Sequence, residues 1–157
     1  MEAIRYEDLL FDRVSGNWPD LREDTQPAFK VNWCHGAPGI GLARLGGLPT
    51  LDTQQIRADV DHAVDVVMRL ELTGADHLCC GNLGRIELLL AAGLTDEARC
   101  RAQVVVDRAA AAGSFELHSS LPGRVHMPGF FMGMSGIGYA LLRIAHPDVL
   151  PSALLWE

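Results

Sequence analysis

The feature that most restricts how this chain can fold is a segment that occurs three times, each time as Gly-x-x-Gly followed by a mostly apolar stretch. The copies are GAPGIGLARL from Gly36, GNLGRIELLL from Gly81 and GMSGIGYALL from Gly133. The second begins 45 residues after the first, and the third 52 residues after the second. A repeat of this period, in which a glycine-opened helix is followed by a more amphipathic one, is typical of helix pairs stacked as a solenoid or a closed ring.

Two amphipathic helices are predicted between the three copies. In each, apolar residues recur at helical spacing along one stripe. The stripes are Ile56, Val60, Ala63, Val67 and Leu70 within 51–72, and Ala98, Ala102, Val105, Ala109 and Ala112 within 95–112. Thr50 or Asp52 is the expected N-cap of the first helix, and Thr95 that of the second, which Gly113 ends. Strand signals are few, so we expect an all-α fold.

The remaining segments are expected to be loops. Segments 15–30 and 113–131 contain prolines and polar residues and connect the predicted helices. The tail AHPDVLPSALLWE ends on apolar residues and should pack back onto the body. GAPGIG has neither the glycine order nor the following Lys-Ser/Thr of a nucleotide-binding loop, so we do not expect a nucleotide site.

Composition narrows the class of protein. The chain of 157 residues has 13 basic and 20 acidic residues, a formal net charge of −7, and no basic cluster. Nucleic acid is therefore not an expected partner. No apolar run approaches the roughly 20 residues of a transmembrane helix. The charged N-terminal sequence MEAIRYEDLLFDR is unlike a secretory signal. We expect no transmembrane segment and a cytoplasmic location.

Three of the four cysteines precede the glycine-opened helices. Cys34 lies just before the first copy, Cys79 and Cys80 lie just before the second, and segment 130–132 before the third has no histidine or cysteine. Because equivalent positions of stacked repeats are neighbours in space, these thiols are placed to converge on one ion. Three thiolates suit Zn²⁺ with an open fourth position. The residues alone leave a second interpretation open, in which the three are buried small apolar side chains.

Several motifs resemble one known family. The chain contains motifs similar to those of the lanthionine synthetase C-like cyclase domain at the end of class II lanthipeptide synthetases. These motifs are WCHGAPGIGLARL, HLCCGNLGR, MPGFFMGMSGIGYALLRI, GNWPDLRE and the ending LPSALLWE. The resemblance identifies 1–157 as the C-terminal part of such a domain. It implies a ring of seven inner and seven outer helices around one zinc ion. About three helix pairs are visible here, so the expected architecture is an incomplete α/α toroid.

The resemblance also implies a reaction and a partner. Zinc held by Cys34, Cys79 and Cys80 would bind the cysteine thiol of a dehydrated lanthipeptide precursor. The thiolate would add to dehydroalanine or dehydrobutyrine and close a thioether ring. From its place directly after the first ligand, His35 is the candidate catalytic residue, which would protonate the enolate formed by addition or position the substrate. A histidine that only bonds to the backbone of its loop is the other interpretation of this position.

The chain departs from the family in ways that bear on its activity. The upstream His and Asp that the family uses for proton handling have no counterpart here, and neither does the dehydratase domain of class II enzymes. We therefore expect a fragment of a larger synthetase that works with the N-terminal part of a synthetase. The alternative interpretation is a non-catalytic zinc- or peptide-binding module, or a structural fragment that completes another chain's helical ring.

Other residues near the motifs receive mainly structural interpretations. His77 should support its loop without binding metal, Asn82 should hold the same loop, and Arg85 should face the cavity. Trp33 either forms a wall of the zinc pocket or packs in the core, and Cys100 should be inert. The remaining histidines, expected on the surface or in loops, are His62, His118, His126 and His146.

Overall fold

A computed structural model describes residues 2–22, 28–117 and 127–156 of the chain. In these ranges the chain forms α-helices and isolated bridges but no strand, which confirms the all-α prediction. The helices are α1 (Glu2–Leu10), α2 (Ala37–Gly47), α3 (Gln54–Met68), α4 (Asn82–Ala91), α5 (Thr95–Ala112) and α6 (Met134–Ala145).

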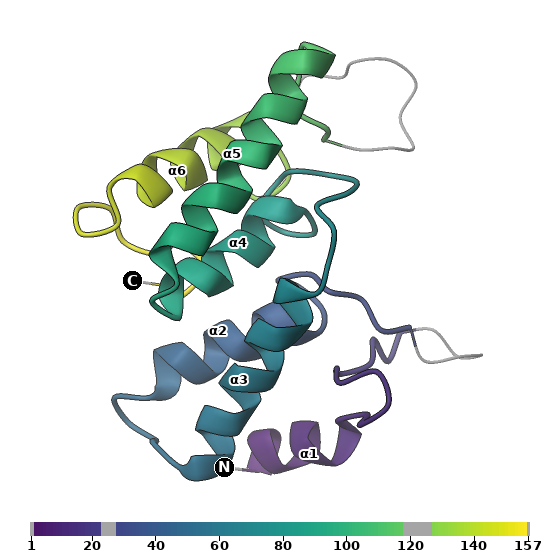
Figure 1. Cartoon of the computed structure of the whole chain (residues 1–157). Helices are drawn as coiled ribbons and strands as arrows, with labels where there is room; N and C mark the ends of the chain where they lie inside the picture. The colour runs from purple at the N-terminus through teal and green to yellow at the C-terminus, as the bar shows by residue number, and fades with distance from the viewer. Residues whose placement is uncertain (1, 23–27, 118–126, 157) are drawn as a thin grey trace.

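The helices form two rows. Those that begin at the repeated glycines form one row, in which α2 contacts α4 and α4 contacts α6. In the second row α3 packs on α2 and α4, and α5 packs on α4 and α6. Figure 1 shows α1 at the N-terminal end of this stack, beside α3. The pairs α2–α3 and α4–α5, followed by α6, form the incomplete α/α toroid that the sequence predicted.

Charged side chains attach α1 to the first helix pair. Arg44 of α2 is 4% exposed; its Nη1 donates to Glu7 of α1 at 2.8 Å, and its Nε donates to Asp59 of α3 at 2.9 Å. A buried guanidinium needs such partners because an unpaired buried charge is strongly unfavourable. This ion-pair network therefore determines where α1 lies against α2 and α3.

The second glycine of each repeated motif allows the helix to begin against its own preceding loop. In all three copies this glycine lies against the carbonyl oxygen of the residue six positions upstream. The distances from an added Cβ to that oxygen are 2.0 Å for Gly39 and Trp33, 2.0 Å for Gly84 and Leu78, and 1.7 Å for Gly136 and Phe130. No side chain fits at these distances. The loop can therefore fold back over the first helical turn and hold its residues at the N-terminus of the helix.

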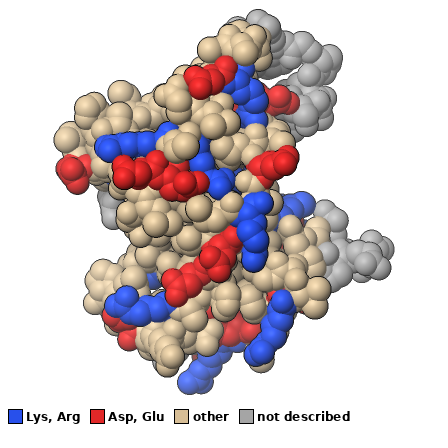
Figure 2. Space-filling model, viewed as in Figure 1, with Lys and Arg blue, Asp and Glu red and all other residues tan. Residues whose placement is uncertain are grey.

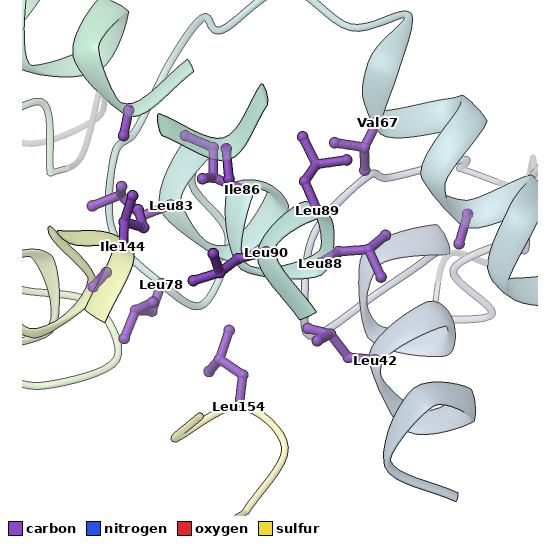
Figure 3. Packing of buried hydrophobic residues seen from close by; sticks show 14 of the residues in the cluster. Leu42, Val67, Leu78, Leu83, Ile86, Leu88, Leu89, Leu90, Ile144 and Leu154 are labelled. Atoms are coloured by element: carbon purple, nitrogen blue, oxygen red, sulfur yellow. The ribbon is translucent and has the colours of Figure 1, made fainter. Parts of the chain in front are cut away.

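The hydrophobic core lies around α4. The apolar side chains that this helix buries are Leu83, Ile86, Leu88, Leu89 and Leu90. Figure 3 shows Leu42 of α2 and Val67 of α3 on one side of them and Ile144 of α6 on the other. Leu154, near the end of the chain, points into the same cluster and is 4% exposed. The tail thus packs back onto the body, as predicted.

The outer helix α3 differs from its prediction at its ends. It is shorter than the expected 51–72, and within its stripe Val60 is only half-buried. Its N-cap is Thr53, whose Oγ1 accepts a hydrogen bond from the backbone N–H of Ile56 at 3.2 Å. The prediction of Thr50 or Asp52 as the cap was wrong. Asp52 instead pairs with Arg57 on the surface.

The outer helix α5 agrees with its predicted range. Thr95 is the first helical residue, so Leu94 takes the N-cap position and the prediction of a Thr95 cap was one residue late. Gly113 ends the helix in the left-handed conformation, with φ of 74°. The buried residues of α5 are Ala98, Ala102, Val105 and Ala109, while Ala112 at the end of the predicted stripe is exposed.

On the face shown in Figure 2, basic and acidic side chains lie next to one another. Within α5, Arg101 Nε pairs with Glu97 Oε1 at 2.6 Å. His62 and His146 are exposed, as predicted, whereas His118 and His126 lie outside the described residues. No helix within the described ranges has the length and apolar character needed to cross a membrane.

Candidate metal centre

Three cysteine side chains meet where α2 and α4 begin. Cys34 is in the loop before α2, and Cys79 and Cys80 are in the turn before α4. Cys34 Sγ lies 3.2 Å from Cys80 Sγ, Cys80 Sγ lies 3.4 Å from Cys79 Sγ, and all three sulfurs are within 4.8 Å of one another. Each residue is half-buried. Cys100 is exposed on α5 and does not belong to this group.

Backbone hydrogen bonds between equivalent loops bring the thiols together. The N–H of Cys34 donates to the carbonyl oxygen of Cys79 at 3.4 Å, and the N–H of Cys79 donates to that of Phe131 at 2.8 Å. Each of these residues stands two positions before the first glycine of its motif. Equivalent positions of successive repeats are therefore neighbours, as the spacing predicted. In the third copy Phe131 occupies the position that holds a cysteine in the other two.

The environment of the sulfurs favours neutral thiols when no cation is present. Burial raises the pKa of Cys34, and the adjacent Cys80 sulfur raises it further. Burial also raises the pKa of Cys79, with added contributions from the Cys80 and Cys34 sulfurs. A divalent cation reverses this balance, because it stabilises the thiolate form of each ligand.

The donor set fits a tetrahedral metal ion. Three sulfurs are available, and thiolates that share one zinc ion lie about 3.8 Å apart when each Zn–S bond is about 2.3 Å. The observed separations require only small side-chain adjustments to reach that value. Half-burial leaves each of the three residues partly accessible. The cluster could thus hold a metal ion and keep one coordination position for another ligand.

Polar side chains of α4 and of the turn before it support both cysteine loops. Arg85 Nε donates to the carbonyl oxygen of Val31 at 2.7 Å, and its Nη1 donates to Asn82 Oδ1 at 3.0 Å. Arg85 therefore braces the Cys34 loop, where the sequence had suggested a residue facing the cavity. His77 is buried, and its Nδ1 accepts the backbone N–H of Cys80 at 3.2 Å. Asn82 Nδ2 donates to Asp76 Oδ1 at 3.0 Å, so His77 and Asn82 both hold this loop, as expected.

The comparison with protein families agrees with this architecture. A family model described as lanthionine synthetase C-like protein matches residues 1–155, which include both cysteine loops and all three glycine motifs. The chain belongs to the lanthionine synthetase C-like family. Members of this family act on peptide substrates, and membership suggests lanthionine-type cyclase activity.

Asn17 is a structural residue of this lanthionine synthetase C-like chain that the sequence did not single out. Its Oδ1 accepts the N–H of Ala37, the first residue of α2, at 2.8 Å, and its Nδ2 donates to the carbonyl oxygen of Lys30 at 3.1 Å. An Asn side chain distant in sequence thus partly caps α2. The available signal was the polar pair that flanks Trp18-Pro19 in GNWPD.

Asp20, from the same GNWPD motif, lies next to the His35 side chain. It is 3% exposed and accepts hydrogen bonds from Arg22 and Lys30, whose Nζ is 3.0 Å from Oδ2. The Arg22 guanidinium holds the pKa of Asp20 well below its usual range, so the carboxylate is charged. His35 Nδ1 lies 3.8 Å from Asp20 Oδ1. The structure therefore places His35, the residue after Cys34, next to a charged carboxylate.

Proposed function

We propose that this chain is part of a cyclase that forms lanthionine-type thioethers in dehydrated precursor peptides. In this reaction a peptide cysteine adds across the double bond of dehydroalanine or dehydrobutyrine. A carbon–sulfur bond forms at the β carbon, the thiol proton is lost, and the α carbon gains one proton, so that no atom is released overall. The observation that carries the proposal is the cluster of three sulfurs within 4.8 Å, in a family that acts on peptides.

The three thiols support zinc as the metal. Cys34, Cys79 and Cys80 would hold one Zn²⁺, which when bound would keep the substrate cysteine deprotonated at neutral pH. Three sulfur ligands donate more charge than nitrogen or oxygen ligands, which favours a nucleophilic sulfur on the substrate. The hydrogen bonds of Arg85 and His77 to the cysteine loops hold the ligands in place, so the chain itself supplies a preorganised site.

We propose that His35 delivers the proton to the α carbon. Its side chain is 26% exposed, and it directly follows Cys34. Asp20 lies 3.8 Å from Nδ1, which leaves Nε2 as the ring nitrogen for proton exchange with the substrate. Asp20, itself held by Arg22 and Lys30, lies beside Nδ1 and so limits the orientations open to the ring. Asp20 is then a positioning residue that acts through His35.

We further propose that the chain acts together with the N-terminal part of a synthetase. Apolar side chains are exposed at the N-terminal end of the stack, where Leu9 is 84% exposed and Val14 is 96% exposed. Leu142 of α6 is 57% exposed, and Val149 beyond it is 76% exposed. Such residues favour association with another surface. The upstream histidine and aspartate that the family uses would come from that partner.

Metal analysis of matched cysteine variants tests the site. The purified chain should contain about one zinc per molecule. Cys80→Ala should lose most of it, because two thiols remain, whereas Cys100→Ala should retain it because Cys100 is remote from the cluster. Equal zinc loss in both variants would contradict the ligand assignment.

A cyclisation assay tests the reaction. A dehydrated peptide that contains one cysteine should lose its free thiol without a change in mass when the zinc-loaded chain and an N-terminal cyclase part are both present. Thioether formation that depends on the cysteine cluster would support the proposal. Zinc binding with no thioether under any condition would instead favour a non-catalytic binding module.

A further inference from the structure

An aromatic cluster stands beside the three thiols. The rings of Trp33 and Phe131 are stacked, with centroids 5.4 Å apart and planes within 4°. The ring of Trp156 lies 6.1 Å from Trp33 and 6.2 Å from Phe131, tilted to both. Trp33 directly precedes Cys34, and the carbonyl oxygen of Phe131 accepts the N–H of Cys79. The cluster is thus attached to two of the three cysteines through backbone.

Trp156 differs from the other two rings because most of it is in solvent. It is 75% exposed, whereas Trp33 and Phe131 are half-buried against the core. Its φ of 62° is the only positive value at a non-glycine residue in the described part of the chain. A bulky residue in this conformation costs roughly 1–3 kcal/mol, and such strain is concentrated at functional sites. Ordinary core packing does not explain a strained, exposed tryptophan.

The segment before Trp156 is firmly anchored, so its position is determined by the fold. Ser152 is fully buried, and its Oγ donates to Glu87 of α4 at 2.6 Å. Leu154 is buried in the core beside α4 (Figure 3). A Cβ added to Gly46 of α2 would lie 3.4 Å from the Leu155 side chain. The tail therefore runs from α4 to the C-terminal end of α2, and the ring of Trp156 lies 6.1 Å from that of Trp33, which precedes Cys34.

We propose that Trp156, with Trp33 and Phe131, forms an aromatic wall that binds the apolar or aromatic side chain next to the reacting cysteine of the substrate peptide. This inference rests on the proposed function for the identity of the ligand as a cysteine peptide. The exposed indole gains contact area only when such a side chain covers it, and aromatic faces bind apolar groups with little loss of side-chain freedom. Trp156 is then a specificity-determining residue. Trp33 both packs against the core and forms part of the aromatic wall.

Two fluorescein-labelled linear peptides test the wall, one with Phe and one with Ser beside a single cysteine and otherwise identical. Binding to the zinc-loaded full chain is measured by fluorescence anisotropy. We expect the Phe peptide to bind more tightly than the Ser peptide. Trp156→Ala should weaken binding of the Phe peptide about tenfold and leave that of the Ser peptide nearly unchanged. Trp156→Phe should retain most of the preference because it keeps an aromatic face.

Tyr6→Ala is the matched control, because Tyr6 is a 57% exposed aromatic residue on α1. It should leave both affinities unchanged. Wild-type protein that binds the two peptides equally, or binds neither, would overturn the wall, as would equal losses for both peptides in Trp156→Ala. Zinc content and the circular dichroism of each variant show whether the site is intact. Neither peptide contains a dehydro residue, so a preference for Phe would stand even if the cyclisation assay failed.

Discussion

Gly84 and Leu78 determine where the second cysteine loop lies, because a Cβ at Gly84 would be 2.0 Å from the Leu78 carbonyl oxygen. That contact holds the loop with Cys79 and Cys80 over the first turn of α4. The same contact recurs at Gly39 and Gly136, so in each copy the glycine motif allows the preceding loop to pack against the first turn of its helix.

We predict that Gly84→Ala destabilises the protein and reduces its metal content. The added methyl group would overlap a backbone oxygen, which cannot move without displacing the loop. The free energy of unfolding should fall by about 2–4 kcal/mol, measured by urea denaturation of the zinc-loaded protein.

Gly138→Ala is the control for this prediction. Gly138 is also in a glycine-opened helix, but it is exposed and a Cβ there would meet nothing within 4 Å. Its replacement should leave stability unchanged or raise it by up to about 1 kcal/mol, because alanine favours helix. Similar destabilisation by both substitutions would contradict a specific role for the contact with Leu78.

Those parts of the site that follow the repeat could be predicted from the sequence. Because Cys34, Cys79 and Phe131 stand at the same place relative to their glycines, stacking of the repeats was enough to predict that the loops meet. The period of the apolar stripes likewise predicted α3 and α5. Helix ends were less certain, because three polar residues near the start of α3 compete as caps and only their local backbone decides in favour of Thr53.

Contacts between segments far apart in the chain could not be predicted. Asn17 and Asp20 belong to a polar loop with no periodic pattern, and only the folded chain shows that they support α2 and His35. Arg85 is in α4, and the direction of its side chain depends on how α4 packs against its neighbours. Its contact with Val31 was therefore not visible in the sequence. Trp156 likewise reaches the site only because the tail packs across α4 and α2.

Asp20 should make the stability of the protein depend on pH in the acidic range. The pKa of Asp20 is lowered by the Arg22 hydrogen bonds, so its stabilising contribution is present above its unfolded pKa near 3.8 and is lost as pH falls below that value. Asp20→Asn should therefore be less stable than wild type at pH 7. The difference between the two proteins should stay constant from pH 7 down to about pH 5 and then narrow progressively as pH falls below 3.8, as followed by urea unfolding across this range.

Asp61→Asn on the exposed side of α3 serves as the control and should follow wild type at every pH. A difference between Asp20→Asn and wild type that stays constant from pH 7 to pH 3 would show that Asp20 does not act through its charge.

His35→Asn tests the proton donor. In the presence of the N-terminal cyclase part, we expect cyclisation to slow by roughly 10²-fold or more while zinc remains bound, because Asn cannot deliver a proton. Asp20→Asn should slow the reaction less, since it removes the partner of the ring and leaves the ring itself. The measurements are single-turnover rates by mass spectrometry of alkylated samples and zinc content. An unchanged rate in His35→Asn would make this histidine structural.

Arg85 offers a test of how far the metal centre depends on support from outside the ligands. It joins the carbonyl oxygen of Val31 to the amide of Asn82, and so connects the Cys34 loop to the helix that follows Cys80. Arg85→Met keeps much of the apolar stem but leaves the Val31 oxygen without this donor. We expect zinc affinity to fall by about 10–100-fold, measured by competition with a chromophoric chelator.

Arg57→Met, which removes a guanidinium from an exposed ion pair with Asp52, should bind zinc as wild type does. Arg85→Lys should lie between Arg85→Met and wild type, because lysine can donate to one acceptor but cannot span both with a planar fork. Measurements well below the unfolding temperature of each variant separate zinc affinity from overall stability. If Arg85→Met binds zinc with unchanged affinity, metal binding does not depend on the support that Arg85 gives to the Cys34 loop.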